Sequence, residues 1–415
     1  MPEPIFILGG QQTDFAKTWS REGEDISDMI RVVTETTLAE CELEASAIDT
    51  IHVGNAFAEL QRQQAHLGAM VAQVVPDLWG VPAMRHEGAC ASSSLAALAA
   101  MAEIEAGRYD CALVLGVEEL KNLPGDESSQ NQNAAAWQGH EGIACRFMWP
   151  AVFGRLAGEY ERRYGIDRRH LNRIAELNYA SARRNPNAQT RRWQFNELSF
   201  TDDDNANPVI EPGVRRQDCG QITDGAAAVI LASARFAAEH ARRGGTSLDA
   251  VPQILGWGHH NGGLRFLDKI ERSREEQFVF PHVRTTITDA WRRADIGGVD
   301  DLDGIETHDC FTSTQYMAID HFGITPTGES WRAVENGDIE MAGRIPMNPS
   351  GGLIGAGHPV GATGARMLLD AARQVTGTAG DYQVEGARVA LGHAYGGGAN
   401  YYAMWIVSSE PAPTF

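Results

Sequence analysis

Cys90 occupies a position from which a thiol could act as a nucleophile. It lies in the small-residue turn Gly88-Ala-Cys90-Ala-Ser-Ser-Ser, which leads directly into an apolar stretch with helical periodicity. The unpaired backbone N–H groups and the dipole at the start of a helix stabilise negative charge, and a thiol placed there can react as a thiolate. An isolated cysteine among small residues is also commonly a buried packing residue. The turn by itself leaves both interpretations open.

A second segment with reactive side chains is Glu306-Thr-His308-Asp309-Cys310-Phe-Thr. We expect it at the end of a strand and the start of a helix. Histidine, aspartate and cysteine can all bind metal ions, but a structural zinc site uses spaced pairs of ligands, which this stretch lacks. Three consecutive side chains of this kind are also unusual as packing residues. The segment therefore favours a catalytic role.

Two glycine-rich segments lie further along the chain. The first runs from Asn348 to Gly364 and contains Gly-His358-Pro. It lacks the Gly-Lys-Ser/Thr of a phosphate-binding loop and the glycine spacing of a dinucleotide site, so its glycines predict tight turns around one restrained histidine. The second, Gly392-His393-Ala394-Tyr-Gly396-Gly-Gly, follows an expected strand. Its backbone N–H groups could form an oxyanion hole, although a hairpin turn or bulge is the structural alternative.

Short apolar runs alternate with stretches of helical periodicity, which is the pattern of an α/β protein. We expect strands over residues 5–8, 50–53, 111–115, 226–231, 253–255, 304–307, 388–391 and 401–407. Helices are expected over 26–41, 93–106, 284–293, 312–322 and 365–375. Residues from about 121 to 218 are polar, without convincing strands, and carry helices over 151–164 and 169–184. This middle segment is predicted to be an insertion between two halves of similar rhythm but no visible sequence repeat.

Composition limits the class of protein. The formal net charge of −20 argues against nucleic acid or an anionic membrane as the main partner. The six cysteines are scattered, which indicates a reducing compartment, and no apolar run approaches the length of a membrane span. The N-terminus lacks a basic signal-peptide region, and the C-terminal Pro-Ala-Pro-Thr-Phe is neither a peroxisomal address nor a prenylation box. These features predict a cytoplasmic protein.

Together the four segments resemble the thiolase family over nearly the whole chain. Cys90 in its turn matches the acyl-accepting nucleophile of that family, and Gly357-His358-Pro359-x-Gly-x-Thr-Gly matches its most recognisable signature. Thr223-Asp-Gly-Ala-Ala-Ala matches another shared turn. The better-known thiolases have a second reactive cysteine where this chain has Ala394. The sequence His308-Asp-Cys310-Phe instead looks like the sterol-carrier-protein-type thiolases, in which that motif supplies the second cysteine.

The resemblance implies a fold and a division of the chain. The fold is an α/β thiolase fold of two βαβαβαββ halves in five layers, with an inserted loop domain. We therefore expect an N-terminal half over residues 1–120, a loop domain over 121–217, the completion of the first half over 218–247, and a C-terminal half over 248–415. The resemblance also implies a homodimer, formed through the sheet of the first half, or a dimer of dimers.

The resemblance further implies ping-pong acyl transfer through an acyl-Cys90 thioester. His358 takes the proton from Cys90, Cys310 is the acid and base at the α-carbon, and His308 helps to bind the enolate oxygen. The N–H groups of Cys90 and Gly396 form the second oxyanion hole. Coenzyme A and acyl-CoA are the substrates, and no metal or redox cofactor is required.

Other residues receive weaker or structural assignments. Arg183 and Arg184, with Arg191 and Arg192, are candidates for binding the nucleotide end of coenzyme A, although a solvated helix end is the more common explanation of such a cluster. The remaining cysteines (Cys41, Cys111, Cys145 and Cys219) and the pair His259 and His260 are assigned to structure.

Two alternatives to a self-sufficient thiolase stay open from the sequence. One is an acyltransferase or retro-aldolase that needs a small accessory protein, although such relatives often lose the nucleophile. The other is a non-catalytic thiolase-like protein that only binds acyl-CoA. Acyl chain length, branching and the direction of the reaction are not predicted.

Overall fold

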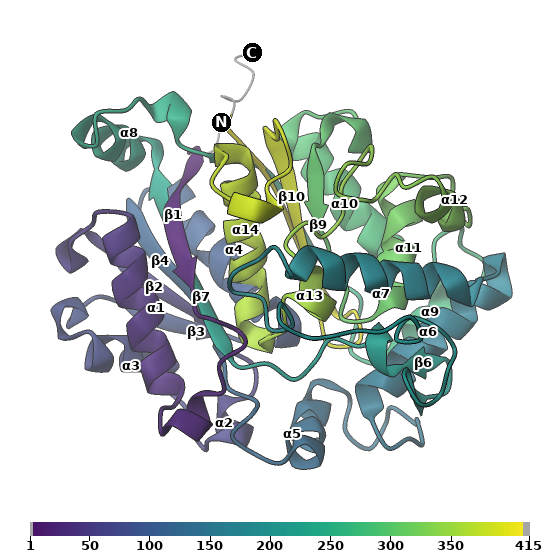
Figure 1. Ribbon diagram of the computed structural model, residues 1–415. Helices are drawn as coiled ribbons and strands as arrows, with labels where there is room; N and C mark the ends of the chain where they lie inside the picture. Colours follow the sequence, from purple (N-terminus) through teal and green to yellow (C-terminus); the bar gives the residue numbers. More distant parts are fainter. Residues whose placement is uncertain (1–2, 410–415) are drawn as a thin grey trace.

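The computed structural model describes residues 3–409 of the chain (Figure 1). Met1, Pro2 and residues 410–415, which include the C-terminal pentapeptide, lie outside the described residues. Within residues 3–409, nine strands form one mixed sheet in the order β3-β2-β4-β7-β1-β8-β11-β10-β9. The strands of the N-terminal part come first in this order and those of the C-terminal part follow. The sheet therefore consists of two sequential halves, which are joined by a short pairing between β1 and β8.

The first half contains the strands β1 (Ile5–Gln12), β2 (Thr50–Gly54), β3 (Ala83–His86), β4 (Cys111–Glu118) and β7 (Gly225–Ser233). Strand β2 is parallel to both β3 and β4, and β7 is antiparallel to both β4 and β1. Strand β4 is buried along its whole length and is joined to β2 through helical crossovers, as expected for the parallel part of a sheet.

The second half repeats this pairing pattern with β8 (Gln253–Asn261), β9 (Gly304–Glu306), β10 (Val389–Gly396) and β11 (Tyr401–Ser408). Strand β9 is parallel to β10, and β11 is antiparallel to both β10 and β8. An isolated parallel bridge between Ile305 and Met347 stands in the position that β3 has in the first half. The halves join where β1 pairs with β8, Ile5 opposite Ile254. The repeat is one of topology and is not visible as a sequence repeat.

Two helices lie between the halves and form the central layer: α4 (Ser92–Glu105) and α14 (Thr363–Thr376) (Figure 1). One buried cluster joins both helices to strands of both halves, for example through Ala97, Leu368 and Trp405. Helix α4 is rich in alanine and serine, so its backbone can approach neighbours closely on several faces. Cys90 and His358 lie just before the first turns of these two helices.

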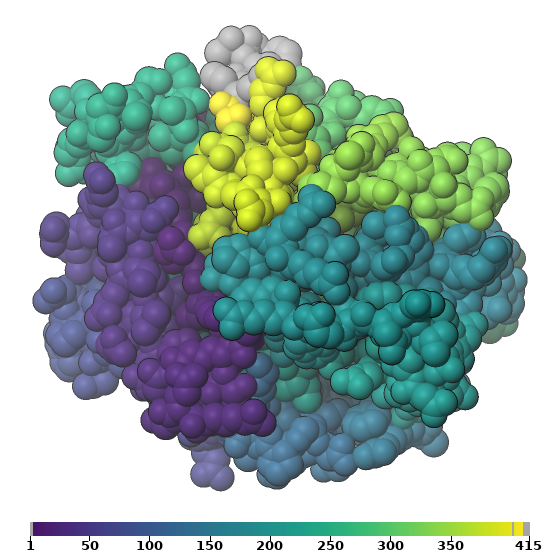
Figure 2. Space-filling model, viewed as in Figure 1, coloured from purple at the N-terminus to yellow at the C-terminus, as the bar shows by residue number. Residues whose placement is uncertain are grey.

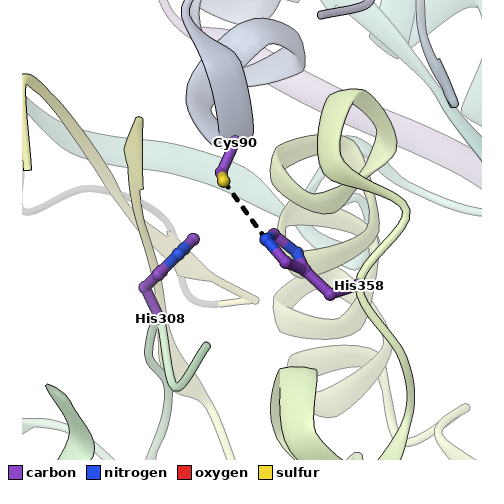
Figure 3. Close-up of side chains that lie close together, drawn as sticks. All are labelled: Cys90, His308 and His358. Atoms are coloured by element: carbon purple, nitrogen blue, oxygen red, sulfur yellow. Dashed lines mark hydrogen bonds between the residues drawn. The ribbon is translucent and has the colours of Figure 1, made fainter. Parts of the chain in front are cut away.

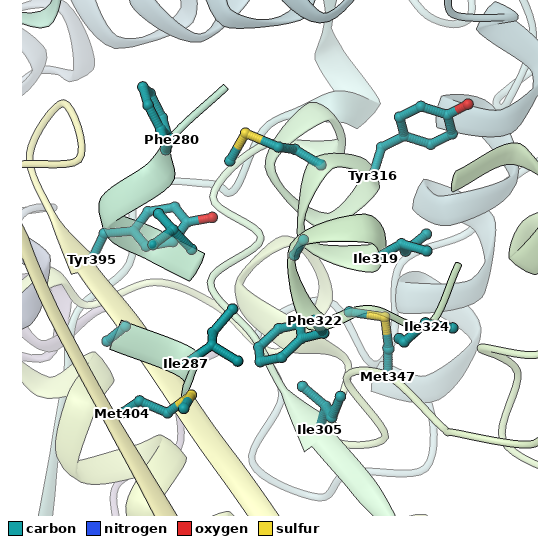
Figure 4. Packing of buried hydrophobic residues seen from close by; sticks show 14 of the residues in the cluster. Phe280, Ile287, Ile305, Tyr316, Ile319, Phe322, Ile324, Met347, Tyr395 and Met404 are labelled. Atoms are coloured by element: carbon teal, nitrogen blue, oxygen red, sulfur yellow. The ribbon is translucent and has the colours of Figure 1, made fainter. Parts of the chain in front are cut away.

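Outer helices cover the far faces of the sheet. Helices α1 (Ile26–Glu40) and α3 (Leu67–Val74) pack on the first half, and α10 (Pro281–Ala294) and α11 (Thr312–Phe322) pack on the second. Figure 4 shows Ile287 of α10 and Phe322 of α11 against Ile305 and Met404 of the sheet. Helix, sheet, helix, sheet and helix thus make the five layers that the resemblance implies.

The polar middle of the chain contains α5 (Gly125–Gln132), α6 (Met148–Tyr164) and α7 (Arg168–Ala182). Its only strands among the described residues are β5 (Val209–Glu211) and β6 (Val214–Arg215), which pair with each other and not with the main sheet. Figure 2 shows this segment, in blue and teal, laid over the lower and central front of the molecule. These elements lie where the insertion is predicted, and the four-part division with its boundaries stays a prediction.

The remaining helices are short or peripheral: α2 (Ala58–Gln61), α8 (Ala234–Arg243), α9 (Phe266–Arg272), α12 (Ser330–Glu335) and α13 (Gly352–Gly355). Strand β3 is a sheet element that the sequence patterns miss. It is an exposed edge strand, so burial does not impose alternation on its residues. Over the described part of the chain, no helix is long and apolar enough to cross a membrane.

Candidate active site

Cys90 lies on a strained turn at the entrance to α4. A short 3₁₀ turn, Ala89–Ala91, precedes the helix, and Ala89 has a left-handed φ of 49°. The Ser92 hydroxyl braces the turn by accepting a hydrogen bond from the Gly88 amide (3.0 Å) and donating to the Ala89 carbonyl (2.6 Å). Strained backbone of this kind is held in place by its surroundings and is common at functional sites. The turn leaves the Cys90 thiol partly exposed to a cavity.

His358 reaches the thiol from the loop before α14. Its Nε2 lies 3.1 Å from Cys90 Sγ, and its Nδ1 lies 2.8 Å from the Thr363 hydroxyl (Figure 3). That hydroxyl donates to the Pro359 carbonyl (3.2 Å), so it accepts the proton of Nδ1. The resulting tautomer leaves the Nε2 lone pair facing the thiol. The Thr223 hydroxyl accepts from the His358 amide (2.9 Å) and fixes the loop from the other side.

The resting pair is uncharged. Burial raises the pKa of the Cys90 thiol to about 12, although a hydrogen bond from the Gly397 amide opposes this increase. Burial, together with the positive charge of Arg366, lowers the pKa of His358 to about 3. A neutral thiol therefore faces a neutral imidazole at physiological pH. Nucleophilic attack by Cys90 then requires transfer of its proton to His358 as the new bond forms.

His308 faces the same point from the loop after β9 (Figure 3). Its ring is nearly perpendicular to that of His358, with centroids 5.3 Å apart, and packs at 4.7 Å against Tyr395. Burial lowers the pKa of His308 well below its usual value, so the ring is neutral and can donate only one hydrogen bond. Its Nδ1 is buried and has no partner among the described residues.

Cys90, His308 and His358 present ligand atoms within 4.8 Å of one another. Sulfur and imidazole nitrogen are donors that zinc accepts, but a structural zinc site uses four ligands and this set offers three. Asp309, which the sequence places beside His308, is not a fourth donor. Its carboxylate accepts from the Leu353 amide (2.6 Å) and from Asn178 Nδ2 (2.8 Å). The set is equally suited to proton transfer and hydrogen bonding, and the expectation of no metal stays a prediction.

Cys310 lies in the same cavity as Cys90 and His358. It is 8% exposed, and burial raises the pKa of its thiol well above the usual value, with a smaller contribution from Cys90. The Gly220 amide donates to the Cys310 carbonyl (2.8 Å) and holds this stretch of backbone. The structure therefore brings together three of the predicted side chains in one cavity, with His308 adjacent to His358.

The fourth segment, with Gly396, forms the tight β10–β11 turn. A Cβ built on Gly396 would lie 2.0 Å from the Gly88 carbonyl oxygen, so the close approach of this turn to the Cys90 loop requires glycine. The backbone amides that lower the pKa of the Cys90 thiol are those of Gly397 and of Cys90 itself. The role of Gly396 stays a prediction, and Gly397 is an additional backbone donor that the glycine run alone does not single out.

The cavity has a volume of about 370 Å³ and a largely apolar wall. Aromatic side chains from three separate segments line it: Phe57, Phe147, Trp149, Phe153 and Phe311. Arg216 is the only lysine or arginine among its described lining residues. Cys219, assigned to structure from the sequence, also lines the wall. No local sequence pattern singles out Arg216 or Cys219; they are found only because folding brings their segment to the cavity that contains Cys90.

Arg183 and Arg184 do not line this cavity. They lie at the end of α7 and line a separate depression of about 800 Å³, together with Arg191, Arg192 and Arg373. Arg191 forms an ion pair there with Asp14 (2.7 Å). Among the residues that the structure describes, none lines both cavities. Clustering in sequence therefore does not place these arginines beside Cys90.

The chain matches two protein-family models. Residues 5–196 match the thiolase N-terminal domain, and residues 266–409 match the thiolase C-terminal domain-like family. An acetyl-CoA acetyltransferase from Methanothermobacter thermautotrophicus is 30% identical over 410 residues, which covers 97% of this chain and 99% of that protein. Sterol carrier protein 2 from Oryctolagus cuniculus is 28% identical over 423 residues, covering 99% of this chain and 73% of that protein.

Among solved structures, the Ltp2-ChsH2(DUF35) aldolase is similar in fold, with a TM-score of 0.74 and 18% sequence identity over 98% of both chains. The family matches span both halves of the sheet and include the segments that carry Cys90, His308, His358 and Gly396. The fold, the repeated topology and these matches agree: the chain belongs to the thiolase family and has the thiolase fold.

Proposed function

We propose that this protein is an acyl-CoA C-acyltransferase that works by a ping-pong mechanism through a thioester on Cys90. The observation that carries the proposal is the 3.1 Å contact between Cys90 Sγ and His358 Nε2, in a tautomer whose lone pair faces the thiol. Such a nucleophile and base pair suits attack on a carbonyl carbon. The acetyl-CoA acetyltransferase relative supports the same reaction class.

In the cleavage direction, Cys90 Sγ attacks the 3-keto carbon of a 3-ketoacyl-CoA, and its proton passes to His358. The bond between C2 and C3 then breaks, which leaves an acyl group on Cys90 and a carbanion on the departing acetyl-CoA. Cys310 protonates that carbanion. Coenzyme A then attacks the thioester as its thiol proton passes to the Cys310 thiolate. The acyl-CoA product leaves, and His358 returns its proton to Cys90 Sγ. Condensation is the reverse sequence, in which Cys310 removes the α-proton.

Two oxyanion sites are proposed. His308 donates to the enolate oxygen of the departing acetyl-CoA, which its neutral state and its position beside His358 allow. The amides of the Cys90 turn and the β10–β11 turn, with Gly396 and Gly397, stabilise the tetrahedral intermediate on Cys90. The closeness of these two turns supports this arrangement.

For the anionic end of coenzyme A, we propose Arg216 as the nearest cation, because it lines the cavity that contains Cys90. Arg183 and Arg184 line another depression, so we do not extend this role to them. The aromatic wall suits the apolar part of an acyl group. No metal or redox cofactor takes part in the proposed steps.

The test is direct detection of the acyl-enzyme. Incubation with acetyl-CoA should add one acetyl group to Cys90, seen by intact-mass and peptide mass spectrometry. The Cys90→Ala variant should fold normally, since alanine fits among the small residues of the turn, but should form no adduct and give no turnover. Cys219→Ala is the matched control, because it removes another thiol from the same cavity. Turnover by Cys90→Ala would disprove the proposal.

The same measurement separates the two alternatives. A non-catalytic acyl-CoA-binding protein would bind acetyl-CoA without forming an adduct. A partner-dependent acyltransferase or retro-aldolase, comparable to the Ltp2-ChsH2(DUF35) aldolase, would act only with a co-purifying second subunit. Adduct formation and thiolysis by the purified single chain would exclude both.

A further inference from the structure

Lys269 is a buried amine on α9, a helix that the proposed mechanism does not use. It is 2% exposed, and its Nζ donates to Asn400 Oδ1 (2.7 Å) and to the Leu264 carbonyl (3.1 Å). Among the described residues, none forms an ion pair with it. Burial lowers its pKa to about 8. The charges of Glu141 and Asp268 oppose this decrease only in part. Burying an amine without a direct carboxylate contact is costly, so a lysine in this position calls for a reason beyond packing.

Asn400, its partner, closes the β10–β11 turn. The backbone N–H of Asn400 donates to the Gly396 carbonyl (2.8 Å), and the backbone carbonyl of Asn400 accepts from the Gly262 N–H (2.8 Å). A Cβ built on Gly397 would lie 2.8 Å from Asn400 Nδ2, so the Asn400 side chain packs directly against Gly397. Lys269 therefore fixes the Asn400 side chain, which in turn packs against Gly397 of the turn.

The other side of this turn faces the nucleophile. The Gly397 amide lowers the pKa of the Cys90 thiol, which places it on the thiol's side of the turn, and Gly396 approaches the Gly88 carbonyl too closely for any side chain. Helix α9 lies behind the turn, where a Cβ built on Gly398 would lie 3.6 Å from the Phe266 side chain. A short chain of contacts thus connects Lys269, Asn400, Gly397 and Cys90.

We propose that Lys269 is a positioning residue for acylation: by holding Asn400 it fixes the β10–β11 turn so that the turn amides point at the reacting centre beside Cys90. The inference rests on the proposed function, because these amides matter for rate only if Cys90 is acylated. Oxyanion donors act at fixed positions, and small displacements reduce the rate substantially. Lys269 does not contact Cys90, and of its two hydrogen-bond partners only Asn400 belongs to the turn, so its proposed effect on acylation is through Asn400.

The first experiment compares Lys269→Met with Arg272→Met. Arg272 is exposed on the same helix, so its replacement removes the same charge without touching the turn. Single-turnover acylation of Cys90 by acetyl-CoA should slow about 10- to 100-fold in Lys269→Met, with little change in KM, and should stay unchanged in Arg272→Met. Wild-type acylation by Lys269→Met, or equal loss in both variants, would overturn the proposal.

A second set of variants keeps the test valid if Lys269→Met fails to fold. Asn400→Ala should reproduce the slow acylation, whereas Asn400→Asp, which retains an acceptor for Lys269, should restore most of the rate. The double variant Lys269→Met with Asn400→Ala should be no slower than either single variant, because both remove one interaction. Losses that multiply in the double variant would show two independent effects and contradict the proposal.

Amide hydrogen exchange provides a readout that does not depend on catalysis. Peptides covering residues 392–404 should exchange faster in Lys269→Met and Asn400→Ala than in the wild type and in Arg272→Met. If the wild type forms no acyl-enzyme, the proposed function fails, while this measurement still tests whether Lys269 holds the turn. Unchanged exchange in both variants would show that it does not.

Discussion

At the scale of single residues, the neutral Cys90 and His358 pair makes a direct prediction about protonation. Burial and Arg366 lower the pKa of His358 to about 3, so its ring should stay neutral from pH 5 to pH 8. An ordinary histidine would gain its proton near pH 6.5. Ring ¹⁵N shifts of labelled protein, with His358 assigned by difference against a His358→Gln variant, should show no titration in this range. A midpoint near 6.5 would contradict the neutral pair.

The second residue-scale prediction separates the two thiols. Cys310→Ala should still accept an acetyl group on Cys90 but should lose carbon–carbon bond cleavage and formation by about 10²–10⁴-fold, because the carbanion lacks its proton donor. Exchange of the acetyl-CoA α-protons with D₂O, followed by mass spectrometry, measures the lost step. Cys219 lines the same cavity, and Cys219→Ala should exchange normally. Wild-type exchange in Cys310→Ala would assign the base to another group, such as His308 or His393.

At the scale of elements, the contact between two loops is the decisive feature. The Asp309 carboxylate binds the amides of Leu353 and Ile354, and thereby docks the His308–Cys310 loop on the glycine-rich loop that leads to His358. Gly352 makes this possible, since its φ is +61° and a Cβ there would lie 2.3 Å from Asp309 Oδ2.

Gly352→Ala should therefore lower both stability and acylation. Gly386→Ala is the matched control, because Gly386 also has a positive φ (+71°) but no neighbouring atom within 4 Å of a Cβ. The control should lose about 1 kcal/mol in the free energy of unfolding from backbone strain alone. Gly352→Ala should lose clearly more, as measured by urea unfolding. Equal losses would mean that the Asp309 contact does not hold the loops together.

At the scale of the whole molecule, the exposed edge of the sheet bears on assembly. Strand β3 pairs on one side with β2 and has no second partner among the described residues. Met84 on this strand is 42% exposed, and nearby in sequence Trp79 is 76% exposed. Unpaired edges with large apolar side chains favour association with another chain. This agrees with the expected dimer through the first-half sheet, which stays a prediction.

Light scattering after size exclusion should accordingly give a dimer or a dimer of dimers at micromolar concentration. Met84→Lys should shift the protein towards the monomer, since an edge lysine opposes strand pairing. A substitution of Val209, which is also exposed but lies on the separate β5–β6 pair, should leave the mass unchanged. A wild-type monomer would contradict the predicted assembly.

The sequence by itself determined which residues are candidates for catalysis and most of the elements that hold them. Cys90, His308, Cys310 and His358 stand out because their residue types and glycine-rich surroundings are local properties. The long strands and helices are predictable because burial imposes their hydrophobic patterns. Strand β3 is not predictable in this way, because an exposed edge has no such pattern.

Only the tertiary structure decided which groups meet. The tautomer of His358 depends on Thr363, and the Gly397 amide, from a segment distant in sequence, lowers the pKa of the Cys90 thiol. Arg216 and Cys219 line the cavity, whereas Arg183 and Arg184 lie elsewhere, because distance in space is independent of clustering in the chain. The topological repeat of the two halves is likewise a matter of strand pairing. Because many unrelated sequences can form the same pairing pattern, the repeat is not visible in the sequence. Long-range contacts set pKa values, docking and cavity walls, and these contacts exist only once the chain has folded.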